Sequence, residues 1–328
     1  MAQAVRTARD RTWLLVGGML LFVAVAARTF DAQQLPWLRN LVIIFGSLLV
    51  EAMPFIALGA LVSAAIEVFV PASAFAKIAL LPRSLQLPAA AISGMAFPVC
   101  ECGSVPVARR LARKGLAPSA AVTFMLAAPI VNPVVIASTA VAYRGRDTFW
   151  VMVLGRFTLG LVVAMVVGWV IGAMRPQDLL RPRGDLEAHE VEDDEPRWRR
   201  FFGHLTGDLV FMARFLILGA LLAAAIQTFV PQSIVDRVAN LPILSLVAMM
   251  ALAYLMSLCS ESDAFVAASF VAFGPSAQLA FLVFGPMVDM KLSALYVGTY
   301  SSGFLRTTVI AVGATTLVAT MWVQVIWG

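Results

Sequence analysis

The chain alternates long apolar stretches with short polar segments. Because a membrane-spanning helix needs roughly 20 mostly apolar residues, this pattern predicts an all-α, polytopic transmembrane helical bundle. A polar segment at 175–203, dense in charge and proline, predicts a cytoplasmic linker between two membrane halves. The apolar stretches run approximately over residues 13–28, 41–70, 86–108, 117–142, 148–174, 204–230, 243–272, 276–299 and 303–327.

The two halves repeat each other. FIALGALVSAAIEVFVP (55–71) matches FLILGALLAAAIQTFVP (215–231) at 11 of 17 positions. Further matches follow in the same order, pairing Cys100 with Cys259 and Asn132 with Asp289. The repeat predicts an extra N-terminal helix within 1–40, a first membrane repeat over 41–174, the linker, and a second repeat over 204–328.

Charge decides between a parallel and an inverted repeat. If 86–112 and 243–272 re-enter the membrane without crossing it, 15 Lys and Arg residues lie inside and 5 outside. The best arrangement in which they cross gives 12 inside and 8 outside. Since cytoplasmic loops carry the excess of Lys and Arg, we expect inverted repeats, seven full spans and two re-entrant hairpins.

Composition narrows the function classes. Hydrophobic residues make up 61% and charged residues 13% of the chain, against about 45–50% and 25% in a soluble domain. This excludes a soluble enzyme and a nucleic-acid partner, and the net charge of +5 is read as an orientation signal. No Walker loop is present, and we expect no cofactor.

Both proposed re-entrant segments contain an interruption that bears chemistry. Cys100-Glu101-Cys102 lies among Pro98, Gly103 and Pro106, which predicts unwound chain with both thiols on one side. Cys259 is the matching thiol. Soft thiolates at these three cysteines favour Zn(II), Cu(I) or trivalent arsenic, although free cysteines are also common as buried apolar side chains.

Intramembrane charges complete the candidate site, because a charge at mid-bilayer is costly and therefore functional by default. Glu101, Glu261 and Asp263 fall in the two interruptions, and Asp289 and Lys291 could pair with each other. A half-helix is expected to begin near Asp263, with Ser104 capping its counterpart. Four charged residues nearer the ends of spans are expected at the interface or in structural ion pairs: Glu51, Arg156, Arg214 and Arg306.

The motifs FPVCECGSVPVARRLARKG (97–115), TFMLAAPIVNPVV (123–135) and CSESDAFVAASF (259–270) resemble those of the predicted permease family that includes the organoarsenical exporter ArsP and the YraQ-type permeases. The last motif is most similar to the YraQ-type branch. The resemblance implies an inner-membrane permease. Carried over to this sequence, it implies that the site includes Cys100, Cys102 and Gly103, and some relatives work with a second membrane subunit. Glu101 between the cysteines, with Glu261 and Asp263, departs from the arsenical branch and suits a cation at least as well.

We therefore predict a permease in the lipid bilayer that moves a small inorganic or organometallic solute, a soft metal ion or a trivalent arsenical, by alternating access. The predicted binding residues are Cys100, Glu101, Cys102, Gly103, Cys259, Glu261, Asp263, Asn132 and Asp289. Two alternatives stay open: a membrane thiol-disulfide oxidoreductase that uses the cysteine pair, and a scaffold for a partner subunit that does not itself transport.

Overall fold

The computed structural model describes residues 36–70, 82–96, 99–173, 196–229 and 242–327. The expected N-terminal helix at 13–28 and most of the polar linker lie outside them. Twelve helices account for most of the described chain: α2 (Pro36–Phe69), α4 (Arg83–Ser93), α5 (Glu101–Arg113), α6 (Pro118–Val131), α7 (Pro133–Ala142), α8 (Phe149–Ile171), α10 (Arg197–Phe229), α12 (Pro242–Met256), α13 (Asp263–Ser269), α14 (Pro275–Phe284), α15 (Met290–Thr299) and α16 (Ser302–Trp327). The all-α prediction is confirmed.

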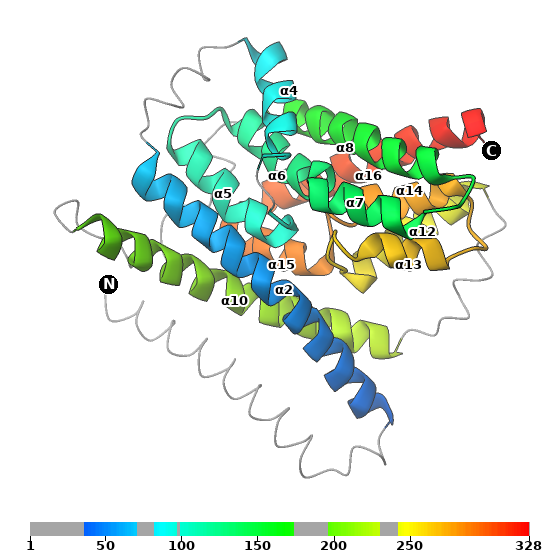
Figure 1. The fold of residues 1–328 in the computed structure, drawn as a ribbon, viewed down its shortest axis with the longest axis horizontal. Helices are drawn as coiled ribbons and strands as arrows, with labels where there is room; N and C mark the ends of the chain where they lie inside the picture. The colour runs from blue at the N-terminus through cyan, green and yellow to red at the C-terminus, as the bar shows by residue number, and fades with distance from the viewer. Residues whose placement is uncertain (1–35, 71–81, 97–98, 174–195, 230–241, 328) are drawn as a thin grey trace.

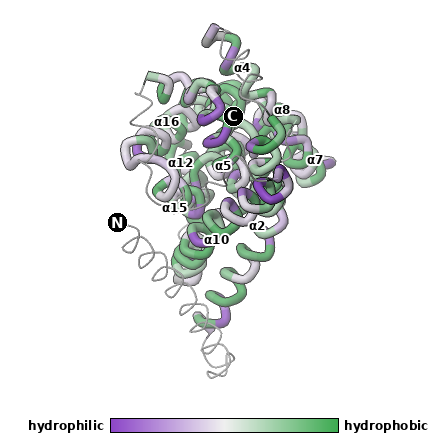
Figure 2. The backbone as a smooth tube through the Cα atoms, turned by 90° about the vertical axis from the view of Figure 1, so that its left-hand side faces the viewer, coloured by the Kyte–Doolittle hydropathy of each residue, from purple (hydrophilic) through white to green (hydrophobic). Residues whose placement is uncertain are grey.

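Five helical stretches in the described part of the chain are long and apolar enough to cross a membrane: α2, α6 with α7, α8, α10 and α16. Large apolar side chains on these helices are exposed, as expected of faces that meet lipid. Figure 2 shows that hydrophobic positions predominate along the backbone of α2 and α10. The described tryptophans are all exposed and lie near the ends of these helices: Trp37, Trp150, Trp169, Trp198, Trp322 and Trp327. Tryptophan collects at the two membrane–water interfaces, so these positions mark the edges of the bilayer.

The two longest helices, α2 and α10, cross each other along one side of the bundle (Figure 1). The short helices α5 and α15 pack against this pair, α5 on α2 and α15 on α10. Behind them α6, α8, α14 and α16 form the remaining bundle, with α4 against α6 and α12 against α14. Glu101 at the start of α5 and Lys291 at the start of α15 are consequently buried inside the bundle.

The two halves contain the same elements in the same order. A long helix (α2, α10) is followed by a short interrupted pair (α4 and α5, α12 and α13), a broken helix (α6 and α7, α14 and α15) and a final span (α8, α16). The break between α6 and α7 falls at Asn132, where the following Pro133 disfavours a helical conformation. Each member of the interrupted pairs has at most 15 residues, which is too short to cross the bilayer alone.

Contacts at the helix ends show which loops are neighbours. The Lys114 ammonium, just after α5, donates to the carbonyl oxygens of Ile66, Glu67 and Val70 at the end of α2. At the far end of α7, Arg146 donates to the Ala268 carbonyl near the end of α13. The loop after α7 therefore lies beside the loop after α13.

Candidate functional site

The site is built where the two interrupted helix pairs meet in the bundle. Helix α5 begins at Glu101, with Cys100 as its extended N-cap residue, and α13 begins at Asp263, as the sequence predicts. The expectation that Ser104 caps α5 is wrong, because the helix starts three residues earlier. The Ser104 hydroxyl instead donates to the Glu101 carbonyl at 2.9 Å.

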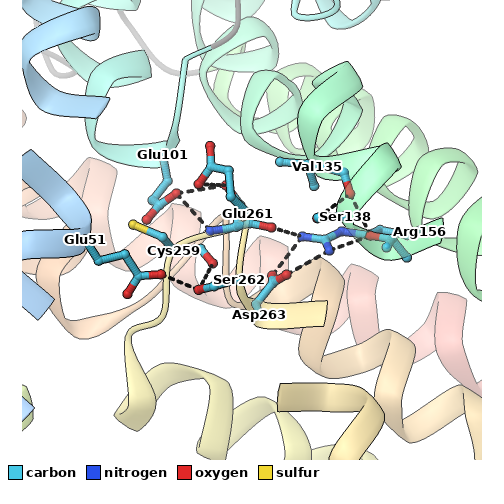
Figure 3. Close-up of polar contacts among 11 residues, drawn as sticks. Glu51, Glu101, Val135, Ser138, Arg156, Cys259, Glu261, Ser262 and Asp263 are labelled. Carbon is cyan, nitrogen blue, oxygen red and sulfur yellow. Dashed lines mark hydrogen bonds and ion pairs between the residues drawn. The ribbon is translucent and has the colours of Figure 1, made fainter. Parts of the chain in front are cut away.

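Glu101 joins the two halves. Its Oε2 accepts hydrogen bonds from the Ser260 hydroxyl at 3.0 Å and, more weakly, from the Ser260 amide at 3.4 Å. One ligand atom from each of Glu101, Cys259 and Glu261 lies within 4.8 Å of the other two, and Figure 3 shows these three side chains gathered between α5 and the start of α13. One thiol and two carboxylates from both repeats thus converge on one point.

The other predicted thiols lie next to this group. Cys100 and Cys102 are buried on either side of Glu101. Only Cys100 is extended, because the helix already includes Cys102; the expectation of unwound chain through both cysteines is therefore too broad. Of the three thiols predicted to bind a soft centre, Cys259 alone belongs to the converging group.

Gly103 lies at a helix crossing. A Cβ at Gly103 would lie 2.9 Å from the Cα of Gly59, and one at Gly59 would collide with Gly103 in return. Because neither position has room for a side chain, α2 and α5 touch through their backbones two residues from Glu101. This contact fixes the position of Glu101 along the axis of α2.

Asp263 and Arg156 form a buried ion pair. Both guanidinium ends of Arg156 bond the Asp263 carboxylate, at 2.8 and 2.7 Å, and further bonds reach the Ser260 carbonyl and the Thr139 hydroxyl. Arg156 has 0% exposed surface. An interfacial position for this arginine, one of the two roles expected from the sequence, is therefore wrong, and the ion pair is the correct one.

Asn132 and Asp289 hold the same place in the two repeats. The Asn132 side chain accepts from the Val134 amide and caps α7, while Asp289 accepts from the Leu292 amide at 2.6 Å and caps α15. The expected pairing of Asp289 with Lys291 is found, with Oδ2 and Nζ 3.8 Å apart. Lys291 also lies 3.6 Å from Glu101 Oε1, so Asp289 is linked to the converging group through Lys291.

Three further polar residues lie here that sequence reasoning did not assign to the site. Ser260 and Ser262 flank Glu261, and Glu51 in the middle of α2 accepts a hydrogen bond from the Ser262 hydroxyl. Ser262 also donates to the Cys259 carbonyl. The available signal for the two serines was that they flank Glu261, close to Cys259, in an otherwise apolar stretch. Glu51 is expected nearer the end of a span, but it lies in the middle of α2, and helix packing brings it to Ser262.

Comparison with known proteins identifies the class of this molecule. A protein of Bacillus subtilis (strain 168) described as UPF0718 protein YcgR is 38% identical over 267 residues, which are 80% of this chain and 89% of the relative. A protein of Streptococcus mutans serotype c, named as a subunit of a two-component membrane permease complex, is 32% identical over 268 residues, 80% of this chain and 87% of its own. No solved structure matches the fold.

Residues 37–325 match the family described as "Predicted permease" (ArsP_1). That span runs from the start of α2 almost to the end of α16. With several apolar helices capable of crossing a bilayer, the chain is a multi-pass protein of the cell membrane. It belongs to the predicted permease family.

Proposed function

We propose that this permease moves a small thiophilic metal cation, bound by Cys259, Glu101 and Glu261. The observation that supports this most directly is the convergence of one thiol and two carboxylate oxygens within 4.8 Å. Thiolate with carboxylate suits a borderline metal such as Zn(II). A cation in contact with all three atoms would draw them together.

The placement of the ligands suggests how the site could open to each side. Glu101 starts α5 in the first repeat, whereas Cys259 and Glu261 precede α13 in the second. A cation would be held between the repeats, as in transporters whose discontinuous helices line a central site. Rocking of one repeat against the other would then expose the site alternately.

A trivalent arsenical is the second candidate cargo. It is favoured by the buried thiols of Cys100 and Cys102, which flank Glu101 and so lie beside the group that contains Cys259. Such a cargo would bind sulfur alone and would have no use for Glu261. The two candidates therefore depend on different residues.

Equilibrium binding of Zn(II) and of a methylated trivalent arsenical to the purified chain tests the proposal. We expect Cys259→Ser to weaken Zn(II) binding at least tenfold, because it removes the one thiol in the group, and Cys100→Ser to change it less than threefold. If Cys100→Ser instead weakened Zn(II) binding more than Cys259→Ser and also abolished arsenical binding, the arsenical would be the favoured cargo. Zn(II) binding that is indifferent to Cys259 would refute the metal site.

We also propose a second membrane subunit. The support is the Streptococcus relative, which is named as a subunit of a two-component complex. Co-purification of the tagged chain from its own membranes would reveal the partner as a stoichiometric second protein. Recovery of the chain alone, still active in transport, would count against it.

A further inference from the structure

A lysine ammonium is enclosed beside the proposed cation site. Lys291 is the second residue of α15 and is 1% exposed. Its Nζ lies 3.6 Å from Glu101 Oε1 and 3.8 Å from Asp289 Oδ2. Within the described chain, none of these three buried atoms has a hydrogen-bond partner.

The distances show how the ammonium is held. Both exceed the 2.7–3.2 Å of a formed N–H···O hydrogen bond, so Lys291 is attracted by charge without being locked to either carboxylate. Lysine is a compact charge on a flexible four-carbon stem. Its head can move between Glu101 and Asp289 while its backbone stays in place.

The charges around Glu101 are unequal. Arg156 is bonded to Asp263 on both guanidinium ends, which leaves Lys291 facing the carboxyl groups of Glu101 and Asp289, with Glu261 next to Glu101. Uncompensated buried carboxylates are costly. Further positive charge is therefore favoured at this point.

The same carboxylate serves two purposes. Glu101 belongs to the converging ligand group and also pairs with Lys291. We propose that the Lys291 ammonium is a tethered counter-cation, which neutralises Glu101 when the site is empty and is displaced toward Asp289 when the cargo cation binds. This inference rests on the cation site proposed above and adds a device that weakens binding and so promotes release.

The fold holds the lysine backbone firmly in place for this role. A Cβ at Gly219 of α10 would lie 2.8 Å from the Lys291 Cα. The backbones of α10 and α15 are thus in direct contact, just as α2 and α5 are at Gly59 and Gly103. The lysine side chain can therefore respond to a cation while its backbone stays in place.

Removal of the competing charge tests the device. We expect Lys291→Met to bind Zn(II) at least tenfold more tightly than the wild type, and Lys291→Arg to stay within threefold of it. If the ammonium were purely structural, Lys291→Met would weaken Zn(II) binding, because loss of the ammonium would loosen the site. The probe is Zn(II) added to the purified full chain, with folding checked by gel filtration and thermal unfolding.

A second pair of variants keeps the test valid if Lys291→Met does not fold. Asp289→Asn preserves the oxygen that caps α15, and Lys291→Met in that background removes a cation together with an anion. We expect the double variant to bind Zn(II) at least tenfold more tightly than Asp289→Asn alone. Arg110→Met, which removes a buried cation paired with Glu67 and Asp208, is the control and should leave the Zn(II) affinity unchanged.

The outcomes separate the two proposals. Unchanged or weaker Zn(II) binding in folded Lys291→Met, or in the double variant relative to Asp289→Asn, overturns the tethered counter-cation, while the cation site stands if Cys259→Ser still weakens binding. Absence of Zn(II) binding to the wild type, or binding indifferent to Cys259, removes both.

Discussion

At the scale of single residues, the Arg156–Asp263 pair ties the second repeat to the first. The arginine comes from α8, and its fork holds both Asp263 and the Ser260 carbonyl beside the ligand group. Ser260 in turn donates to Glu101. The ion pair therefore orients the segment that carries Cys259 and Glu261.

Arg156→Gln is expected to destabilise the protein by about 3–5 kcal/mol, because it leaves the Asp263 charge buried without its partner. Unfolding in detergent measures this, with the exposed Arg144→Gln as the control. A loss below about 1 kcal/mol would mean that the pair contributes little net stability. Replacing Arg156 and Asp263 together with Leu should cost much less than Arg156→Gln.

The sequence predicts such acids better than their partners. Asp263 is visible as a charge within an apolar stretch, whereas its partner is 107 residues away and looks like one of several arginines near the ends of spans. Cys259 and Glu261 are likewise evident from the sequence. Their meeting with Glu101, and the place of Lys291 beside it, depend on how the helices pack.

At the scale of elements, short helices are positioned by backbone contacts at glycine. Gly59 and Gly103 bring α2 and α5 together near Glu101, and Gly219 lets α10 touch α15 at Lys291. Gly59 and Gly219 hold the same place in the repeated segments 55–71 and 215–231, and small residues of this kind let membrane helices pack closely. The breaks are also predicted, since proline and glycine mark them, but the residue at which α5 starts is not.

Gly59→Ala should push α5 away from α2, because the new methyl group would collide with the Gly103 backbone. We expect at least a fivefold loss of Zn(II) affinity in a protein that still folds. Gly46→Ala lies on the same helix and meets no atom within 4 Å, so it serves as the matched control. Equal binding by the two variants would show that this contact does not position the ligands.

At the scale of the whole molecule, repetition is evident from the sequence, but its orientation is a spatial property. The loop after α5 and the loop after α13 hold corresponding places in the two repeats. Arg146 links the loop after α7 to the end of α13, and α6 with α7 separates the loop after α7 from the loop after α5. The corresponding loops would then lie at opposite ends of the bundle, which favours an inverted repeat over a parallel one.

Cysteine accessibility in cells tests this orientation. Arg113, Asp147 and Ala272 are exposed and lie at the end of α5 and in the loops after α7 and α13, whereas the three described native cysteines are buried. With the basic loops inside, a membrane-impermeant maleimide should label Asp147→Cys and Ala272→Cys in intact cells, and Arg113→Cys only after permeabilisation. Labelling of Arg113→Cys and Ala272→Cys from the same side would require parallel repeats, in which the matched interruptions would approach the site from one face. Labelling from opposite sides would place the matched interruptions of the two repeats at opposite faces of the membrane, as in transporters built from inverted-topology repeats.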